Sequence, residues 1–164
     1  MEVNSKRIIE TVSGEGNKTS EEDLRSEREQ PHNEMPFAIG VDIVEIARFD
    51  KYVKSLETRF CERVFTLNEL EYLKTKKAAS MAGLFAAKEA VAKALGTGFR
   101  GFYPHDIEIQ HSESGAPHVV FHGKAKQLAH EAKILISISH TKTLAVAVAL
   151  KVWLCQNHCR KRRT

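Results

Sequence analysis

The chain has 164 residues and a net charge of +4, with 42% hydrophobic and 28% charged residues. This length and composition are typical of one soluble globular domain. The longest apolar stretch, TLAVAVALKVWL, is too short to cross a membrane, and the polar N-terminus does not resemble a signal peptide. The three cysteines lack the spacing of a disulfide framework. We therefore expect a cytoplasmic protein without a membrane segment.

The first 34 residues differ from the rest in composition. They contain nine acidic and five basic residues, few aliphatic side chains and no aromatic ones, so we expect 1–34 to be a disordered or non-native extension. The domain itself is expected over 35–153, with a basic tail at 154–164. Because 1–34 carries a net charge of −4, the remaining residues carry +8. A basic body of this kind suits an anionic ligand and an acidic protein partner, and it also suits nucleic acid.

The central stretch, SMAGLFAAKEAVAKALGTGFRG at residues 80–101, predicts a helix followed by a loop. Strong helix formers dominate it, and no Gly or Pro interrupts residues 84–95. Gly96 then offers a residue that adopts positive φ beyond the helix end. Four apolar residues recur at helical spacing and predict one stripe that faces the core: Met81, Phe85, Ala92 and Leu95.

The first expected strand, in PFAIGVDIVEI, contains an aspartate. The large residues predict one buried face, formed by Phe37, Ile39, Val41 and Ile43. The opposite face carries little bulk before Asp42, so another element can lie close to the backbone there. An Asp in the middle of a strand is disfavoured, which indicates a partner or a task for Asp42, although an edge-strand Asp bonded to a nearby loop fits as well.

A second carboxylate, Glu89, lies on the central helix four residues before Lys93. This spacing is common in exposed ion pairs, which contribute a few tenths of a kcal/mol. Together with Asp42, however, Glu89 forms a pair of acidic residues from separate elements, and one or two carboxylates are what Mg²⁺ uses when phosphates and water complete its shell.

The remaining elements are read from periodicity and turn residues. FTLNEL fits a capping box between Thr66 and Glu69, which makes Glu69 a structural cap rather than a catalyst. The alternation in 144–150 places alanines on one face, which predicts close approach of a helix or of a neighbouring subunit. The expected elements are helices at 48–60, 66–73 and 124–133, strands at 134–140 and 144–150, and a hairpin of 106–111 with 117–123. This order predicts an α+β fold with a largely antiparallel sheet and packed helices.

Four strings in this order resemble the holo-[acyl-carrier-protein] synthases, the bacterial branch of the 4′-phosphopantetheinyl transferase superfamily. The resemblance extends over residues 35–152, and the strings are GVDIVEIARF (40–49), FTLNEL (65–70), FAAKEAVAKALGTG (85–98) and SISHT (137–141). It implies a 4′-phosphopantetheinyl transferase-like fold and a homotrimer with active sites between subunits. It also implies a Mg²⁺-dependent transfer of the 4′-phosphopantetheine arm of coenzyme A to a serine of apo-acyl carrier protein, which releases 3′,5′-ADP.

The resemblance assigns roles to residues of this chain. Asp42 and Glu89 would hold the metal, and Glu89 and Lys93 would be catalytic, with Lys93 stabilising charge on the leaving phosphate. The residues expected to contact coenzyme A are Lys88, Lys93, Gly96, His140 and Thr141. Lys88 could instead contact the carrier, and His140 could be a turn residue that bonds its own backbone. The general base is either Glu89 or a metal-held water.

One departure concerns Leu84, which stands where family members commonly carry a basic residue. This substitution predicts weaker cofactor binding unless Arg100 or Lys77 compensates. It also motivates an alternative function, that of a non-catalytic module that binds coenzyme A or the carrier. A small nucleic-acid binder is a third reading, based on the basic body, but such proteins interleave aromatic residues on a basic face and this chain lacks them. We expect neither nucleic acid nor a membrane as a partner.

Overall fold

The computed structural model describes residues 37–130 and 132–153. The expected extension at 1–34 and tail at 154–164 lie outside the described residues. The elements follow in the order β1 (Phe37–Glu45), η2 (Ile46–Phe49), α2 (Asp50–Val53), α3 (Arg59–Val64), α4 (Leu67–Leu73), α5 (Ala78–Ala94), η3 (Pro104–Asp106), β2 (Ile107–His111), β3 (Pro117–Phe121), α6 (Gly123–Ala129), β4 (Ala132–His140) and β5 (Leu144–Trp153).

All strand pairs of the described residues are antiparallel, in two sheets. One sheet has the order β1-β5-β4, and the other is the hairpin β2-β3. In the first sheet Asp42 lies opposite Ala147, and Ala147 lies opposite Ile138. The predicted α+β architecture, its antiparallel sheet and its hairpin are confirmed.

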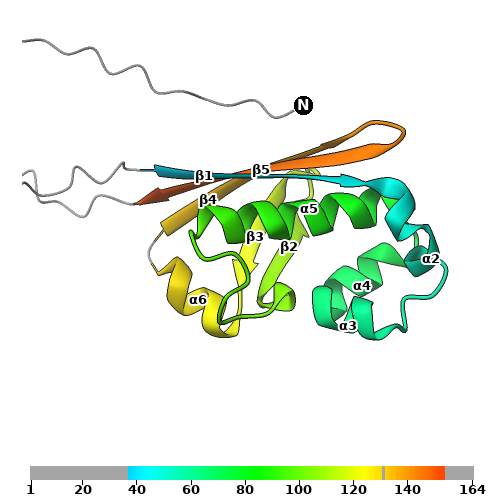
Figure 1. Cartoon of the computed structure of the whole chain (residues 1–164), viewed down its shortest axis with the longest axis horizontal. Coiled ribbons are helices and arrows are strands. Elements are labelled where there is room, and N and C mark those ends of the chain that lie inside the picture. Colours follow the sequence, from blue (N-terminus) through cyan, green and yellow to red (C-terminus); the bar gives the residue numbers. More distant parts are fainter. Residues whose placement is uncertain (1–36, 131, 154–164) are drawn as a thin grey trace, which may run out of the picture. The chain divides into compact units, whose positions relative to one another are not determined.

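Helix α5 is the central element, and it lies along one face of the three-stranded sheet (Figure 1). Its other sides contact η2, α2 and β2. Because it is covered from several directions, it buries most of its residues rather than one stripe, so the predicted single stripe is too narrow. Met81 and Ala92 are fully buried, but Phe85 and Leu95 are only partly buried. The helix ends at Ala94, and Gly96 just beyond it has the predicted positive φ, 87°.

The two faces of β1 are the reverse of those predicted. Ile39 and Ile43 are about 60% exposed in the single chain, whereas Gly40 is buried and Asp42 is half-buried. The reason is that the face with little bulk, not the face with large side chains, lies against α5. A Cβ placed on Gly40 would lie 1.9 Å from the backbone oxygen of Ala90, so only glycine allows this approach.

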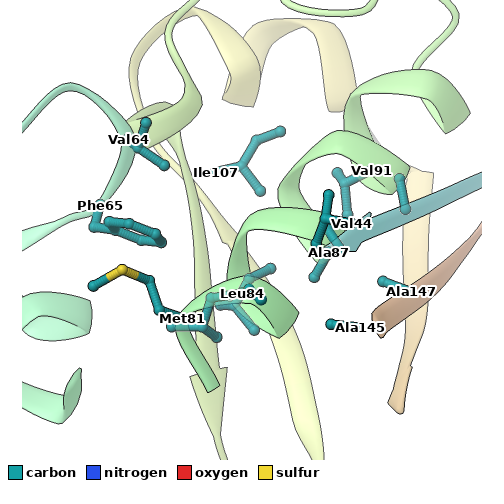
Figure 2. Packing of buried hydrophobic residues seen from close by; sticks show 14 of the residues in the cluster. Val44, Val64, Phe65, Met81, Leu84, Ala87, Val91, Ile107, Ala145 and Ala147 are labelled. Carbon is teal, nitrogen blue, oxygen red and sulfur yellow. The ribbon is translucent and has the colours of Figure 1, made fainter. Parts of the chain in front are cut away.

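The alanine face of β5 packs in the same way. Ala145, Ala147 and Ala149 are buried, and the element against them is α5. Of the two predicted neighbours, a helix or a second subunit, the described chain therefore shows the helix. Figure 2 shows Ala145 and Ala147 close to Val44 and Ala87 in the apolar core. Small residues bring the sheet and the helix close together, as dense packing requires.

The single helix predicted at 48–60 is wrong, because η2 ends at Phe49, α2 ends at Val53 and a new helix, α3, begins at Arg59. Thr58 is the N-cap of α3, and its hydroxyl accepts a hydrogen bond from the Cys61 backbone N–H at 3.2 Å. A Thr in this extended conformation competes with helix continuation and starts a new helix instead.

The other predicted helices agree more closely with the structure. The capping box at the start of α4 is present, with Thr66 accepting from the Glu69 N–H and Glu69 accepting from the Thr66 N–H. Helix α6 ends at Ala129, four residues earlier than predicted, and is followed by His130 with φ of 45°. No helix within the described ranges is both long and apolar enough to cross a membrane.

We predict that Gly40→Ala destabilises the fold by about 3 kcal/mol or more, because the added methyl group overlaps the backbone of α5. Gly115→Ala is the matched control. Its φ of 83° imposes a strain of about 1–2 kcal/mol, but its Cβ meets no atom within 4 Å. Urea denaturation of both variants measures the difference. Equal losses of stability would show that the close approach of β1 and α5 is not tight.

Candidate active site

Asp42 and Lys93 join β1 to α5 by an ion pair. The Nζ atom of Lys93 lies 2.8 Å from Oδ1 of Asp42, and it also donates to the backbone oxygen of Val41 at 2.9 Å. The Asp42 side chain is 15% exposed and the Lys93 side chain 49%. The ammonium is therefore anchored on one side and open to a ligand on the other. This geometry replaces the expected Glu89–Lys93 surface pair, since Lys93 forms its ion pair with Asp42.

The second carboxylate oxygen of Asp42, Oδ2, is buried and has no hydrogen-bond partner among the described residues. A buried carboxylate oxygen without a partner is costly, and such groups usually have a bound ion or another task. The strand therefore holds Asp42 in a state that a cation would stabilise.

Glu89 lies close enough to Asp42 for their charges to interact. Burial raises the pKa of Glu89, the negative charge of Asp42 raises it further, and Lys93 partly opposes both effects. A carboxylate that is partly desolvated and beside a second carboxylate favours any added positive charge. Asp42 and Glu89 thus come together as predicted, although 47 positions separate them in the sequence.

Asp42 and Glu89 fit a magnesium ion whose other ligands are a phosphate and water. The described residues contain no group of three His, Cys, Asp or Glu side chains able to bind a metal by themselves. Mg²⁺ does not need such a group, because it is usually held by one or two carboxylates together with substrate phosphates and water. The unpaired Oδ2 of Asp42 and the raised pKa of Glu89 are the features expected of that arrangement.

Lys88 does not lie at this site. Its side chain is 1% exposed, and Nζ pairs with Glu69 at 2.8 Å and donates to the backbone oxygens of Pro104 and Ile107. Burial lowers the pKa of Lys88, and the charge of Glu69 opposes that shift. These contacts do not fit the predicted contact of Lys88 with a phosphate or a carrier. They make Lys88 the partner of the capping glutamate instead.

His140 ends β4, and Thr141 opens the turn that leads to β5. His140 Nδ1 lies 3.1 Å from the backbone oxygen of Thr141, and the Thr141 hydroxyl accepts from the backbone N–H groups of Thr143 and Leu144. His140 is two residues beyond Ile138, which shares its row across the sheet with Asp42. Strand β5 lies between β1 and β4, so two strand spacings, about 10 Å, separate the backbone of β4 from that of β1 within one chain.

Gly96 lies just beyond Lys93, and its N–H donates to the Lys93 backbone oxygen at 3.0 Å. No described atom lies within 4 Å of the Cβ position of Gly96, so the backbone at this point is open. Leu84, where a basic residue was expected, is 2% exposed and belongs to the apolar core (Figure 2). The described chain uses this position for packing.

Sequence reasoning missed the Val41 carbonyl and the unpaired Asp42 oxygen. Both depend on the register between β1 and α5, which is a property of packing. The only signal in the sequence was the small residue at Gly40, which indicated a close neighbour without naming it.

Comparison with known proteins gives the class of this chain. A family model described as the 4′-phosphopantetheinyl transferase superfamily matches residues 38–149. The chain belongs to this superfamily. Within it, the curated relatives are holo-[acyl-carrier-protein] synthases. The protein of that name from Clostridium kluyveri is 50% identical over 121 residues, which cover 71% of this chain and 90% of the relative. The one from Thermoanaerobacter sp. is 46% identical over 123 residues, covering 72% and 88%.

Solved structures agree with this assignment. The Helicobacter pylori holo-[acyl-carrier-protein] synthase in complex with coenzyme A has a TM-score of 0.61 and 37% identity, with 69% of this chain and 98% of that one covered. The Plasmodium yoelii acyl carrier protein synthase with ADP bound has a TM-score of 0.63 and 36% identity, with 71% and 95% covered. The shared fold therefore extends over almost the whole of each of these proteins.

We predict that Lys88→Met destabilises the protein by about 3–5 kcal/mol, because it leaves the buried charge of Glu69 without its cation. Lys93→Met is the matched control, since its ion pair is half-exposed and contributes about 1 kcal/mol or less. Thermal and urea unfolding followed by circular dichroism compare the two. A Lys88→Met protein as stable as the wild type would contradict a structural role for this lysine.

Proposed function

We propose that this protein is a holo-[acyl-carrier-protein] synthase, which transfers the 4′-phosphopantetheine group of coenzyme A to a serine of apo-acyl carrier protein and releases 3′,5′-ADP. The observation that carries this proposal is the pair of carboxylates on β1 and α5, with an unpaired Asp42 oxygen and an anchored Lys93. The superfamily and the names of the curated relatives support it.

In the proposed site Asp42 and Glu89 hold Mg²⁺ together with a phosphate of coenzyme A. When bound, the ion neutralises the pyrophosphate and polarises the phosphorus that is attacked. The support for these ligands is the buried Oδ2 of Asp42 and the raised pKa of Glu89, which burial causes and the Asp42 charge increases. Glu89 is also the candidate for the group that accepts the serine proton, because a carboxylate with a raised pKa is a better base.

Lys93 is proposed to stabilise the leaving phosphate. Its Nζ is held between Oδ1 of Asp42 and the backbone oxygen of Val41, which fixes a positive charge at the edge of the site before any substrate arrives. A charge that is already in place needs no reorganisation when negative charge develops in the transition state. The half-exposed side chain leaves the ammonium within reach of a phosphate oxygen.

The contacts of coenzyme A with Gly96, His140 and Thr141 are proposed to form between subunits of a homotrimer. In one chain β5 separates β4 from β1, and the sheet exposes a face of large apolar residues. Its members are Ile39, Val41, Ile43, Leu135, Leu144 and Val148, and they are 37–60% exposed. An apolar face of this kind is costly in water, and further copies of the chain would cover it. A neighbouring copy would then supply its turn to this site.

The carrier is proposed to bind beside η2 and α2, which follow the C-terminal end of β1. A hollow of about 740 Å³ lies at η2 and α2 and is lined by Arg48, Lys51 and Lys54 around Tyr52 and Phe60. Basic side chains around aromatic ones suit an acidic protein, and carrier proteins of this class are acidic.

We also propose a cytoplasmic location, in keeping with the free thiol of Cys61.

The function is tested by incubating the full-length chain with coenzyme A, Mg²⁺ and apo-acyl carrier protein and measuring intact mass. We expect the carrier to gain one phosphopantetheine group. An unchanged carrier mass, together with measurable binding of coenzyme A, would instead identify the non-catalytic binding module. Omission of Mg²⁺ with added chelator should abolish the transfer, and retained transfer would contradict the metal.

Variants of the three site residues should lose activity without losing the fold. We expect Asp42→Ala and Glu89→Ala to show little transfer at saturating Mg²⁺, because each removes a proposed metal ligand. Lys93→Ala should lower turnover by about 10²–10³, as when one preorganised donor to a transition state is removed. The exposed Lys126→Ala serves as the control. Near-normal turnover of any of the three site variants, measured by the same mass assay, would remove that residue from the site.

The trimer is tested at the apolar face of the sheet. Ile39→Asp should convert the trimer into monomers, because a carboxylate would be buried between subunits without a partner. Leu128→Asp is the control, since Leu128 is 42% exposed on α6. Sedimentation velocity measures the state of each. A wild-type chain that sediments as a monomer would contradict the proposal.

The carrier surface is tested by charge reversal. Arg48→Glu should raise the KM for the carrier several-fold and leave the KM for coenzyme A unchanged, and the KM for the carrier should rise with salt as charges are screened. Lys126→Glu on α6 carries the same charge change away from the hollow. If both variants had the same effect, the net charge rather than this surface would attract the carrier.

A further inference from the structure

A second group of charges lies on the side of α5 that faces β2 and η3. It contains two carboxylates, Glu69 and Glu108, which are each 2% exposed, and one lysine, Lys88. Lys88 pairs with Glu69 at 2.8 Å and also interacts electrostatically with Glu108. One ammonium cannot neutralise two carboxylates. The cluster therefore lacks one positive charge, and buried charges without a counterion are unfavourable.

Glu108 is the carboxylate that lacks a permanent cation. Its Oε1 accepts from the side-chain amides of Asn68 at 3.0 Å and Gln110 at 2.9 Å, and its Oε2 lies 2.7 Å from Nε2 of His122. Burial would raise the pKa of Glu108, but these hydrogen bonds outweigh it and hold the pKa below its usual value, so the group is ionised. Among the described residues its one ion-pair partner is His122, which is charged only when protonated.

A hollow of about 540 Å³ opens beside Glu108 and His122. Its volume lies in the range of small-molecule sites. No Lys or Arg is among its described lining residues, although the body of the protein is strongly basic. The apolar part of the wall is formed by Phe65, Leu67 and Leu70, and Leu67 is 85% exposed. The hollow thus combines a buried negative charge with an exposed apolar surface.

We propose that this hollow binds a small aliphatic amine, with the ammonium group against Oε2 of Glu108 and the alkyl stem over Leu67. An ionised carboxylate offers about four acceptor positions. The side chains of Asn68, Gln110 and His122 occupy three of them, which leaves one on Oε2. The ammonium supplies the missing positive charge, and the stem covers the exposed leucine. The apolar wall beside Glu108 suits the alkyl stem of an organic cation, which a metal ion lacks. This site is separate from Asp42, Glu89 and Lys93.

The test is a titration of the full-length chain with butylammonium chloride in phosphate buffer, followed by NMR of the His122 ring, which is assigned by its loss in His122→Gln. At about pH 8 we expect a saturable shift. Butanol, which has the same length without the charge, should give no saturable shift. A shift that does not saturate, or equal binding of butanol, would overturn the proposal.

Two variants test separately the contact of the ammonium group with Glu108 and the contact of the alkyl stem with Leu67. Glu108→Gln should weaken butylammonium binding about tenfold, the usual loss for one charged hydrogen bond, whereas the exposed Glu113→Gln should leave it unchanged. Leu67→Ala keeps the fold, because Leu67 is exposed, and should weaken butylammonium several-fold while leaving ethylammonium unaffected. Wild-type affinity in Glu108→Gln or in Leu67→Ala would show that the hollow does not bind the amine as proposed.

Discussion

The close contact between β1 and α5 at Gly40 is the constraint on which the candidate site depends. The backbone of Ala90 and Ala94 lies where the Cβ of any other residue would be, so the strand and the helix are closer here than a side chain at position 40 would allow. Two residues along the strand, this register sets Asp42 beside Glu89 and Lys93. Charged groups are held in place here by the packing of small residues, because a dense backbone contact does not shift easily.

Helix α5 carries its charged residues to two different environments. Lys88 is turned toward β2 and η3, where burial and the capping glutamate Glu69 enclose it. Glu89 and Lys93 are turned toward β1, at the edge of the core, where they remain in reach of a ligand. Residues that are neighbours in the sequence thus have a structural task on one side and a proposed chemical task on the other. The difference follows from the rotation of about 100° per residue along a helix.

The three-stranded sheet is covered on one face and open on the other. Alanines of β5 and Gly40 allow α5 to lie close on the covered face, while the large side chains of β1 point outward. A single chain therefore leaves its most apolar strand face in water. A fold of this kind gains stability when further copies cover that face. The proposed trimer and the proposed sharing of the β4–β5 turn between subunits both follow from this one imbalance.

The sequence by itself determined much of the fold and named residues of the candidate site. Helical propensity with Gly96, the capping box at Thr66 and the alternation in the hairpin and in β4 and β5 are local signals, and the structure contains each of these elements. Local signals drew attention to Asp42 and Glu89, and the family resemblance assigned roles to them and to Lys93. Three outcomes were decided only by tertiary structure: which face of β1 is buried, where the helix after β1 is interrupted, and that Lys88 is enclosed while Lys93 is open. Alternation identifies two faces of a strand but not the one that a helix covers. That choice depends on how closely two backbones can approach, which is a property of the packed pair and not of either segment.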